Sequence, residues 1–97
     1  MMESPASTQA PTANALSERL RERLSPAHLE VIDESHLHAG HAGSNGLGHG
    51  THFRVRIASH LFTGLTPLAR HRLVYDALDD FIEQGVHALA IEAKLLT

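Results

Sequence analysis

The chain has 97 residues, the size of one domain with a single core. Eight Lys and Arg residues against eleven Asp and Glu residues give a net charge of −3, which disfavours non-specific nucleic-acid binding because that binding requires cations that neutralise phosphates. There are nine histidines and no cysteine, so the chain forms no disulfide, has no thiol nucleophile and supplies no thiolate to a metal or a cluster.

Residues 1–14 are rich in Ser, Pro, Thr and Ala, a composition typical of a disordered leader, and we assign the folded domain to residues 15–97. The leader lacks the charged start and apolar run of a secretory signal, and no stretch approaches the length of a membrane-spanning helix. We therefore expect a cytoplasmic protein.

The domain is predicted to open with a short amphipathic helix. Leu16, Leu20 and Leu24 recur every four residues with charged residues between them, and the helix should stop near Ser25 and Pro26.

A strand and a long loop are predicted next. Residues 28–35 read as a strand with Leu29 and Val31 on one face. Residues 36–50 contain five glycines and four histidines, which excludes a stable helix or central strand. A loop of this length in a compact domain is usually functional or disordered.

Residues 51–59 alternate apolar and polar side chains, which predicts a half-buried strand. The inward set is Phe53, Val55 and Ile57, and the outward set is His52, Arg54 and Arg56.

A turn at Gly64 leads to a second helix, in which Thr66 is the N-cap and Pro67 the first residue. We predict one continuous helix that ends at Gly85. Its buried residues should be Val74, Leu78, Phe81 and Ile82, with His71 on the same side. A last strand is predicted over residues 86–95, with Leu89 and Ile91 inward.

The element order is helix, strand, strand, helix, strand, which predicts an α+β fold of the αββαβ type. The first two strands should be antiparallel. The last should return through the helical crossover and lie parallel to its neighbour, so that the helices cover one face of a three-stranded mixed sheet.

Five segments together resemble the BolA family. They are Asp33-Glu34-Ser35, Thr51-His52-Phe53-Arg54-Val55, Phe62-Thr63-Gly64, Arg70-His71-Arg72-Leu73-Val74-Tyr75 and His87-Ala88-Leu89-Ala90-Ile91. The resemblance extends over residues 16–93, and its specific part is the Arg-His-Arg helix followed at this distance by the His-Ala-Leu strand. The chain departs from the family pattern at Gly50, where an acidic residue usually precedes Thr-His-Phe.

This resemblance implies a fold similar to the type II KH domain. It also implies a non-enzymatic adaptor that pairs with a monothiol glutaredoxin and shares a [2Fe–2S] cluster, in iron–sulfur cluster trafficking or in iron or redox regulation. The family's C-terminal histidine ligand maps onto His87. The second ligand, from the loop between the first two strands, maps onto His38, with His41 as the alternative.

The residues alone leave these ligands open. His87 follows a glycine that ends a helix, and such a rigid site suits a ligand, but a histidine in phase with Leu89 and Ile91 can equally be a packed structural residue. The loop histidines could also bind a zinc or nickel ion without any partner.

The remaining candidates have weaker indications. We interpret His52 as a surface residue and His71 as a residue that packs against the sheet. A possible nucleic-acid or partner surface comprises Arg54, Arg56, Arg70 and Arg72. These arginines support an alternative function, a DNA-binding transcriptional regulator that uses the KH-like fold. The negative charge and the lack of a Gly-x-x-Gly loop between helices count against high affinity. No catalytic triad or paired carboxylate site stands out, so no enzyme is predicted.

Overall fold

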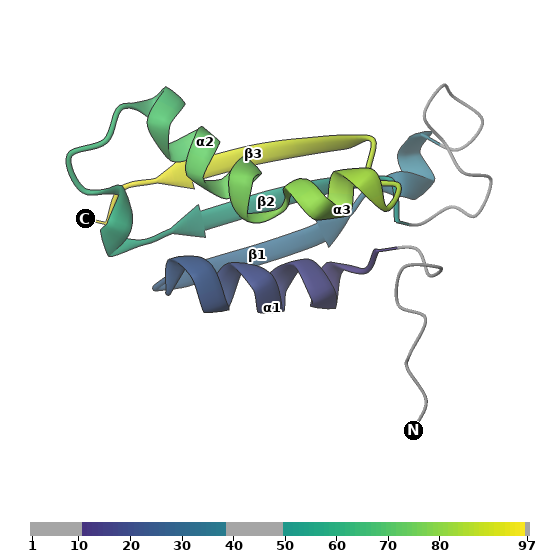
Figure 1. Ribbon diagram of the computed structural model, residues 1–97, viewed down its shortest axis with the longest axis horizontal. Coiled ribbons are helices and arrows are strands. Elements are labelled where there is room, and N and C mark those ends of the chain that lie inside the picture. The colour runs from purple at the N-terminus through teal and green to yellow at the C-terminus, as the bar shows by residue number, and fades with distance from the viewer. Residues whose placement is uncertain (1–10, 39–49, 97) are drawn as a thin grey trace.

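The computed structural model describes residues 11–38 and 50–96, and these form one layer of helices on one sheet (Figure 1). In chain order the elements are α1 (Ala13–Leu24), β1 (His28–Asp33), the 3₁₀ helix η2 (Ser35–His38), β2 (His52–Ala58), the 3₁₀ helix η3 (His60–Phe62), α2 (Pro67–Ala77), α3 (Asp79–Glu83) and β3 (Ala88–Lys94). None of the described helices is long and apolar enough to span a membrane.

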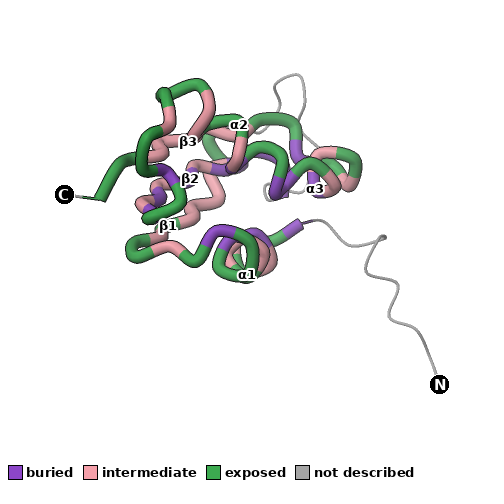
Figure 2. Tube along the Cα trace, turned by 60° about the vertical axis from the view of Figure 1, so that its left-hand side comes forward, coloured by how far each residue is buried: buried purple, intermediate pink, exposed green. Residues whose placement is uncertain are grey.

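The sheet has the order β1-β2-β3, with β1 antiparallel and β3 parallel to the central strand. This confirms the predicted α+β fold and its mixed sheet. The crossover from β2 to β3 runs through α2 and α3, which lie with α1 on the same face of the sheet (Figures 1 and 2).

The core lies between the sheet and the helices, because alternate residues of β2 point toward them. Phe53, Val55 and Ile57 are at most 1% exposed, as the alternating pattern predicted. In α1, the predicted stripe of Leu16, Leu20 and Leu24 is buried against this face. Buried residues gather along β2 and on the helices that cover it (Figure 2).

The first helix begins slightly earlier than its leucine spacing suggests. Thr12 is the N-cap, and its hydroxyl accepts a hydrogen bond from the backbone N–H of Ala15 at 3.1 Å. Ala13 and Asn14 are therefore helical, although their composition groups them with the leader. Ser25 ends the helix in the left-handed conformation, at φ 45°.

The prediction of one continuous second helix is wrong. Thr66 and Pro67 do start it as expected, but α2 ends at Ala77 and α3 begins at Asp79. Leu78, with φ −112° and ψ 8°, interrupts the helix and is itself fully buried. The interruption at Leu78 accompanies the burial of Leu78 and Phe81 in the core. No proline or glycine in the sequence indicates it.

The strands are shorter than predicted. β1 ends at Asp33 instead of residue 35, because Ser35 opens η2. β2 and β3 each lose residues at both ends of the predicted ranges. The predicted turn at Gly64 is present after η3, and Gly64 has φ +80°, a left-handed conformation that glycine adopts without strain.

Candidate functional site

His87 lies immediately before β3, at the end of the sheet where α3 returns the chain. Val86 beside it is 2% exposed and fixes the segment in the core. The backbone N–H of His87 donates to the carbonyl of Thr51 at 2.7 Å, and Ala88 donates to the same oxygen at 3.1 Å. The backbone of His87 is thus held while its side chain is exposed. This arrangement suits a ligand that must meet a partner, because the element end is rigid.

His52 lies beside His87, and its interpretation as a surface residue is wrong. The side chain is 8% exposed, and the centres of the two imidazole rings are 5.4 Å apart. The cause is the parallel register, which sets His52 opposite Ala88 and so brings His87 next to it. The Nδ1 atom of His52 lies 2.8 Å from the hydroxyl oxygen of Thr51, which fixes the orientation of the ring.

Asp33 and Ser35 hold the two ends of the histidine-bearing loop together. One carboxylate oxygen of Asp33 accepts from the Ser35 backbone, and the other accepts from the Gly50 backbone at 3.0 Å. The Ser35 hydroxyl oxygen accepts from the N–H groups of Thr51 and His52 at 2.9 and 3.0 Å. Ser35 is 2% exposed. These bonds fix the point where the loop leaves and re-enters the sheet.

The sequence interpretation did not assign a role to Asp33, Ser35 or Thr51. A signal was present, because an Asp two residues before a Ser at a strand end is a common side-chain-to-backbone turn pattern. Asp33 and Gly50 are 17 positions apart in the sequence, so no local pattern indicated that the Asp33 carboxylate bonds the backbone on both sides of the loop.

The loop candidates lie only partly within the described chain. His38 is the last residue of η2, whose first residue, Ser35, bonds to Thr51 and His52 at this end of the sheet. Its side chain lies outside the described residues, as does the whole of His41. The choice between His38 and His41 as the second ligand therefore stays a prediction.

The four arginines do not form one surface. Arg54 and Arg56 lie on the open face of the sheet, since they alternate with the buried residues of β2, whereas Arg70 and Arg72 lie on α2 on the opposite face. Arg70 donates to the carbonyl oxygen of Leu65 at 3.2 Å. A single phosphate-binding surface made by all four is therefore wrong.

Arg54 and Arg56 are also neutralised by carboxylates from β1, from the residue that follows β1 and from β3. Arg54 pairs with Glu34 at 2.9 Å and with Glu92 at 3.0 Å. Arg56 pairs with Glu30 at 3.2 Å and with Glu92 at 3.3 Å. The hydrogen bond from Arg54 lowers the pKa of Glu92, and the bond to Glu34 raises the pKa of Arg54. We call these five side chains the open-face network.

His71 does not pack against the sheet as expected. Its side chain is exposed, and its ring stacks on Tyr75 one turn later, with the ring centres 6.4 Å apart. The residue stands on the solvent side of α2, because Val74 and Ala77 form the buried side.

The candidate ligand atoms at this sheet end are the imidazole nitrogens of His87 and His52. Within the part of the chain that the structure describes, no group of three or more potential metal ligands gathers. A metal centre bound through His87 therefore needs further ligands from the rest of the loop or from another molecule. Imidazole donors fit an iron–sulfur cluster whose thiolates come from elsewhere, because histidine replaces cysteine on one iron of some [2Fe–2S] centres.

Residues 20–96 match the family model described as BolA, BolA-like protein. Similar proteins include SufE-like protein 1, chloroplastic/mitochondrial, of Arabidopsis thaliana, which is 49% identical over 81% of this chain. BolA-like protein 1 of Mus musculus is 48% identical over 87% of this chain. The matched regions span only 22% and 58% of the lengths of these two relatives.

Solved structures agree with the fold. The structure of BolA1 from Arabidopsis thaliana superposes with a TM-score of 0.76 at 41% identity, covering 90% of this chain and 94% of that one. The BolA domain of SufE1 from Arabidopsis thaliana has a TM-score of 0.75 at 43% identity, covering 86% of this chain and 90% of that one.

Proposed function

The chain belongs to the BolA-like family, and on this premise we propose that it is a non-enzymatic adaptor that binds a monothiol glutaredoxin and shares a [2Fe–2S] cluster with it. Its role would be in iron–sulfur cluster trafficking or in iron or redox regulation. The observation that carries this proposal is the exposed imidazole of His87 on a fixed backbone, in a chain that has no cysteine.

His87 is the first ligand in this proposal. Its backbone is bonded to Thr51, so the imidazole is presented at one place on the surface without a large loss of freedom on binding. The glutaredoxin and glutathione would supply thiolates, and the bound cluster would supply one-electron chemistry and a transferable iron–sulfur unit.

The second ligand is His38, with His41 as the alternative. Asp33 and Ser35 fix the base of the loop beside the start of β2, so a loop histidine can approach His87 from that side. His52 is a third candidate that only the three-dimensional arrangement introduces, because its ring lies 5.4 Å from that of His87. If the second ligand is a loop histidine, the role of His52 would be to orient the imidazole ring of His87.

The domain content of the relatives supports an accessory role. One solved structure is of the BolA domain of SufE1, so the fold occurs within a larger protein as well as in BolA-like proteins. A small domain that recurs in both contexts suits a binding module better than a complete catalyst. This supports an adaptor but leaves the partner to experiment.

The test is reconstitution of the cluster in a mixture. The full chain, a monothiol glutaredoxin, glutathione, iron and sulfide are combined, and visible circular dichroism is recorded with and without the chain. We expect a new cluster spectrum and a 1:1 complex on gel filtration when the chain is present. Identical spectra with and without the chain would refute the proposal.

A further inference from the structure

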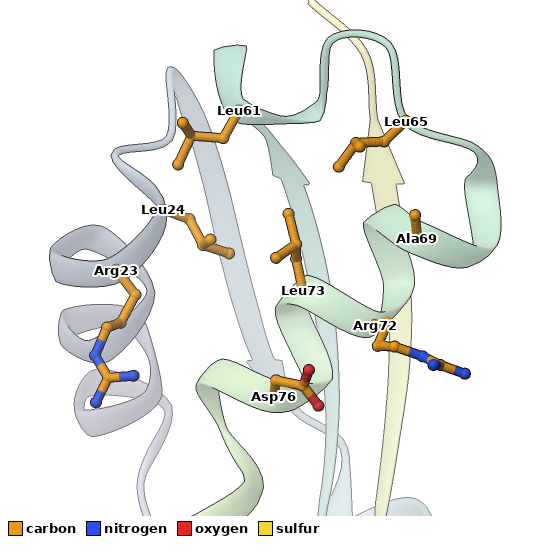
Figure 3. A pocket seen from close by; sticks show the side chains of 8 residues that line it. All are labelled: Arg23, Leu24, Leu61, Leu65, Ala69, Arg72, Leu73 and Asp76. Carbon is orange, nitrogen blue, oxygen red and sulfur yellow. The ribbon is translucent and has the colours of Figure 1, made fainter.

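A groove of about 550 Å³ lies between the C-terminal end of α1 and the first turns of α2 (Figure 3). Its lining is mostly aliphatic, with leucines from α1, η3, the following turn and α2 pointing toward one another. The lining residues are Leu24, Leu61, Leu65, Ala69 and Leu73, together with Arg23, Arg72 and Asp76.

The aliphatic part of this groove is not covered by any segment of the chain that the structure describes. Leu61, in η3, is 43% exposed, and Leu65 and Leu73 are only partly buried against the core. Contiguous apolar surface with a polar rim is typical of an interaction site, because covering it removes apolar area from water.

The groove carries two arginines that are not neutralised by an ion pair. Ion pairs within the described chain involve only three arginines, Arg19, Arg54 and Arg56. The guanidinium groups of Arg23 and Arg72 are among those with no ion-pair partner among residues 11–38 and 50–96. Asp76 is the single acid in the lining, so the groove is net positive in a chain of charge −3.

We propose that this groove binds an acidic amphipathic helical segment of a partner protein. Aliphatic side chains of the segment would enter among the leucines, and its carboxylates would pair with Arg23 and Arg72. A groove between two helices suits a helix with an apolar stripe, whereas small-molecule sites usually enclose their ligand. Asp76 would repel a carboxylate of the segment placed beside it, so the segment must bind with its acidic residues away from Asp76.

The groove is separate from the site around His87, so this proposal does not depend on the cluster. Leu61 follows the C-terminal end of β2, and His87 precedes the N-terminal end of β3. Because β2 and β3 are parallel, the two sites lie at opposite ends of the sheet. A bound segment and a partner at His87 can therefore be present together.

The test is selection of random 12-residue peptides for binding to the immobilised full chain. Binding of each selected peptide, after labelling, is then measured by fluorescence anisotropy. We expect the selected peptides to contain two aliphatic residues three or four positions apart, together with Asp or Glu. The double variant Arg23→Glu with Arg72→Glu should weaken their binding by about tenfold or more, since it reverses both charges. Leu61→Ser should weaken it as well.

Matched controls use residues outside the lining. Arg21→Glu makes the same charge reversal in the same helical turn as Arg23, and Leu68→Ser changes a leucine that is 66% exposed. Both should leave binding unchanged, as should His87→Ala. Failure to enrich any peptide, selected peptides that are neutral or basic, equal losses in the controls, or self-association of the chain through the groove would each overturn the proposal.

Discussion

Ser35 is the residue on which the geometry of the histidine site most depends. Its buried hydroxyl group accepts hydrogen bonds from Thr51 and His52 and donates one to Asp33. A buried N–H that loses its acceptor costs more free energy than an average hydrogen bond contributes, because the group stays away from water.

We therefore expect Ser35→Ala to lower the free energy of unfolding by about 1–3 kcal/mol. Urea denaturation followed by far-UV circular dichroism measures this. Ser17→Ala is the control, since the Ser17 hydroxyl bonds only a carbonyl of its own helix, at 2.8 Å, and its removal should be nearly neutral. Equal stability of the two variants would show that Ser35 does not hold the loop base.

His87 could be recognised from the sequence because it belongs to a local motif at a fixed distance from the Arg-His-Arg helix. His52 could not be assigned, since alternation gives the face of a strand but not what covers it. Its burial arises from the β2–β3 register, which pairs residues 36 positions apart. The loop-spanning role of Asp33 is equally non-local.

At the scale of elements, the contact of α1 with α3 depends on Arg19. Its guanidinium pairs with both carboxylate oxygens of Asp80, donates to the carbonyl of Ala77 and lies 4.8 Å from the ring centre of Phe81. The hydrogen bond from Arg19 lowers the pKa of Asp80 below its ordinary 3.8. One side chain thus joins the two helices on either side of the break at Leu78 to α1.

This pair predicts an acid-sensitive contribution to stability. The lowered folded-state pKa means that the ionised carboxylate stabilises the fold above about pH 4, and that this contribution is lost as the pH falls through the folded-state pKa. Because the Asp80 side chain is 43% exposed, Asp80→Asn should cost only about 1 kcal/mol at pH 7 and almost nothing at pH 2.5.

Denaturation of both proteins from pH 2.5 to 7 measures the difference. Glu83→Gln, an exposed residue of the same helix with no ion pair in the described chain, is the control and should change stability little at any pH. A stability difference for Asp80→Asn that is independent of pH would contradict the role of the ion pair.

Hydrophobic periodicity predicted most of the buried residues of these helices but not their break. Val74, Leu78 and Phe81 are buried as the helical spacing predicted, whereas Ile82 is only half-buried. The interruption at Leu78 depends on the shape of the core beneath it, which no local signal in the sequence encodes.

At the scale of the whole molecule, charge is arranged so that the open sheet face has little net positive potential. The open-face network contains three glutamates and two arginines. Phosphate binding would have to compete with these carboxylates, which disfavours DNA binding by this face.

We expect weak, salt-sensitive binding of duplex DNA by the unmodified chain, and tighter binding by Glu92→Gln, which removes one of the two carboxylate partners of each arginine. Fluorescence anisotropy with labelled duplex between about 20 and 200 mM salt, a range that shortens the Debye length roughly threefold, measures this. Glu83→Gln makes the same charge change away from the network and is the control. Tight binding by the unmodified chain would favour the DNA-binding alternative.

The proposed function requires that a histidine of this chain ligates a cluster shared with a glutaredoxin. Pulsed electron paramagnetic resonance of the reduced complex, with ¹⁵N-histidine incorporated into this chain alone, detects such a ligand. We predict ¹⁵N couplings from two histidines, of which one set is lost in His87→Ala, whereas both sets persist in His71→Ala because His71 is exposed on α2. A reduced cluster in the complex without ¹⁵N coupling, or with couplings unchanged in His87→Ala, would show that His87 is not a ligand.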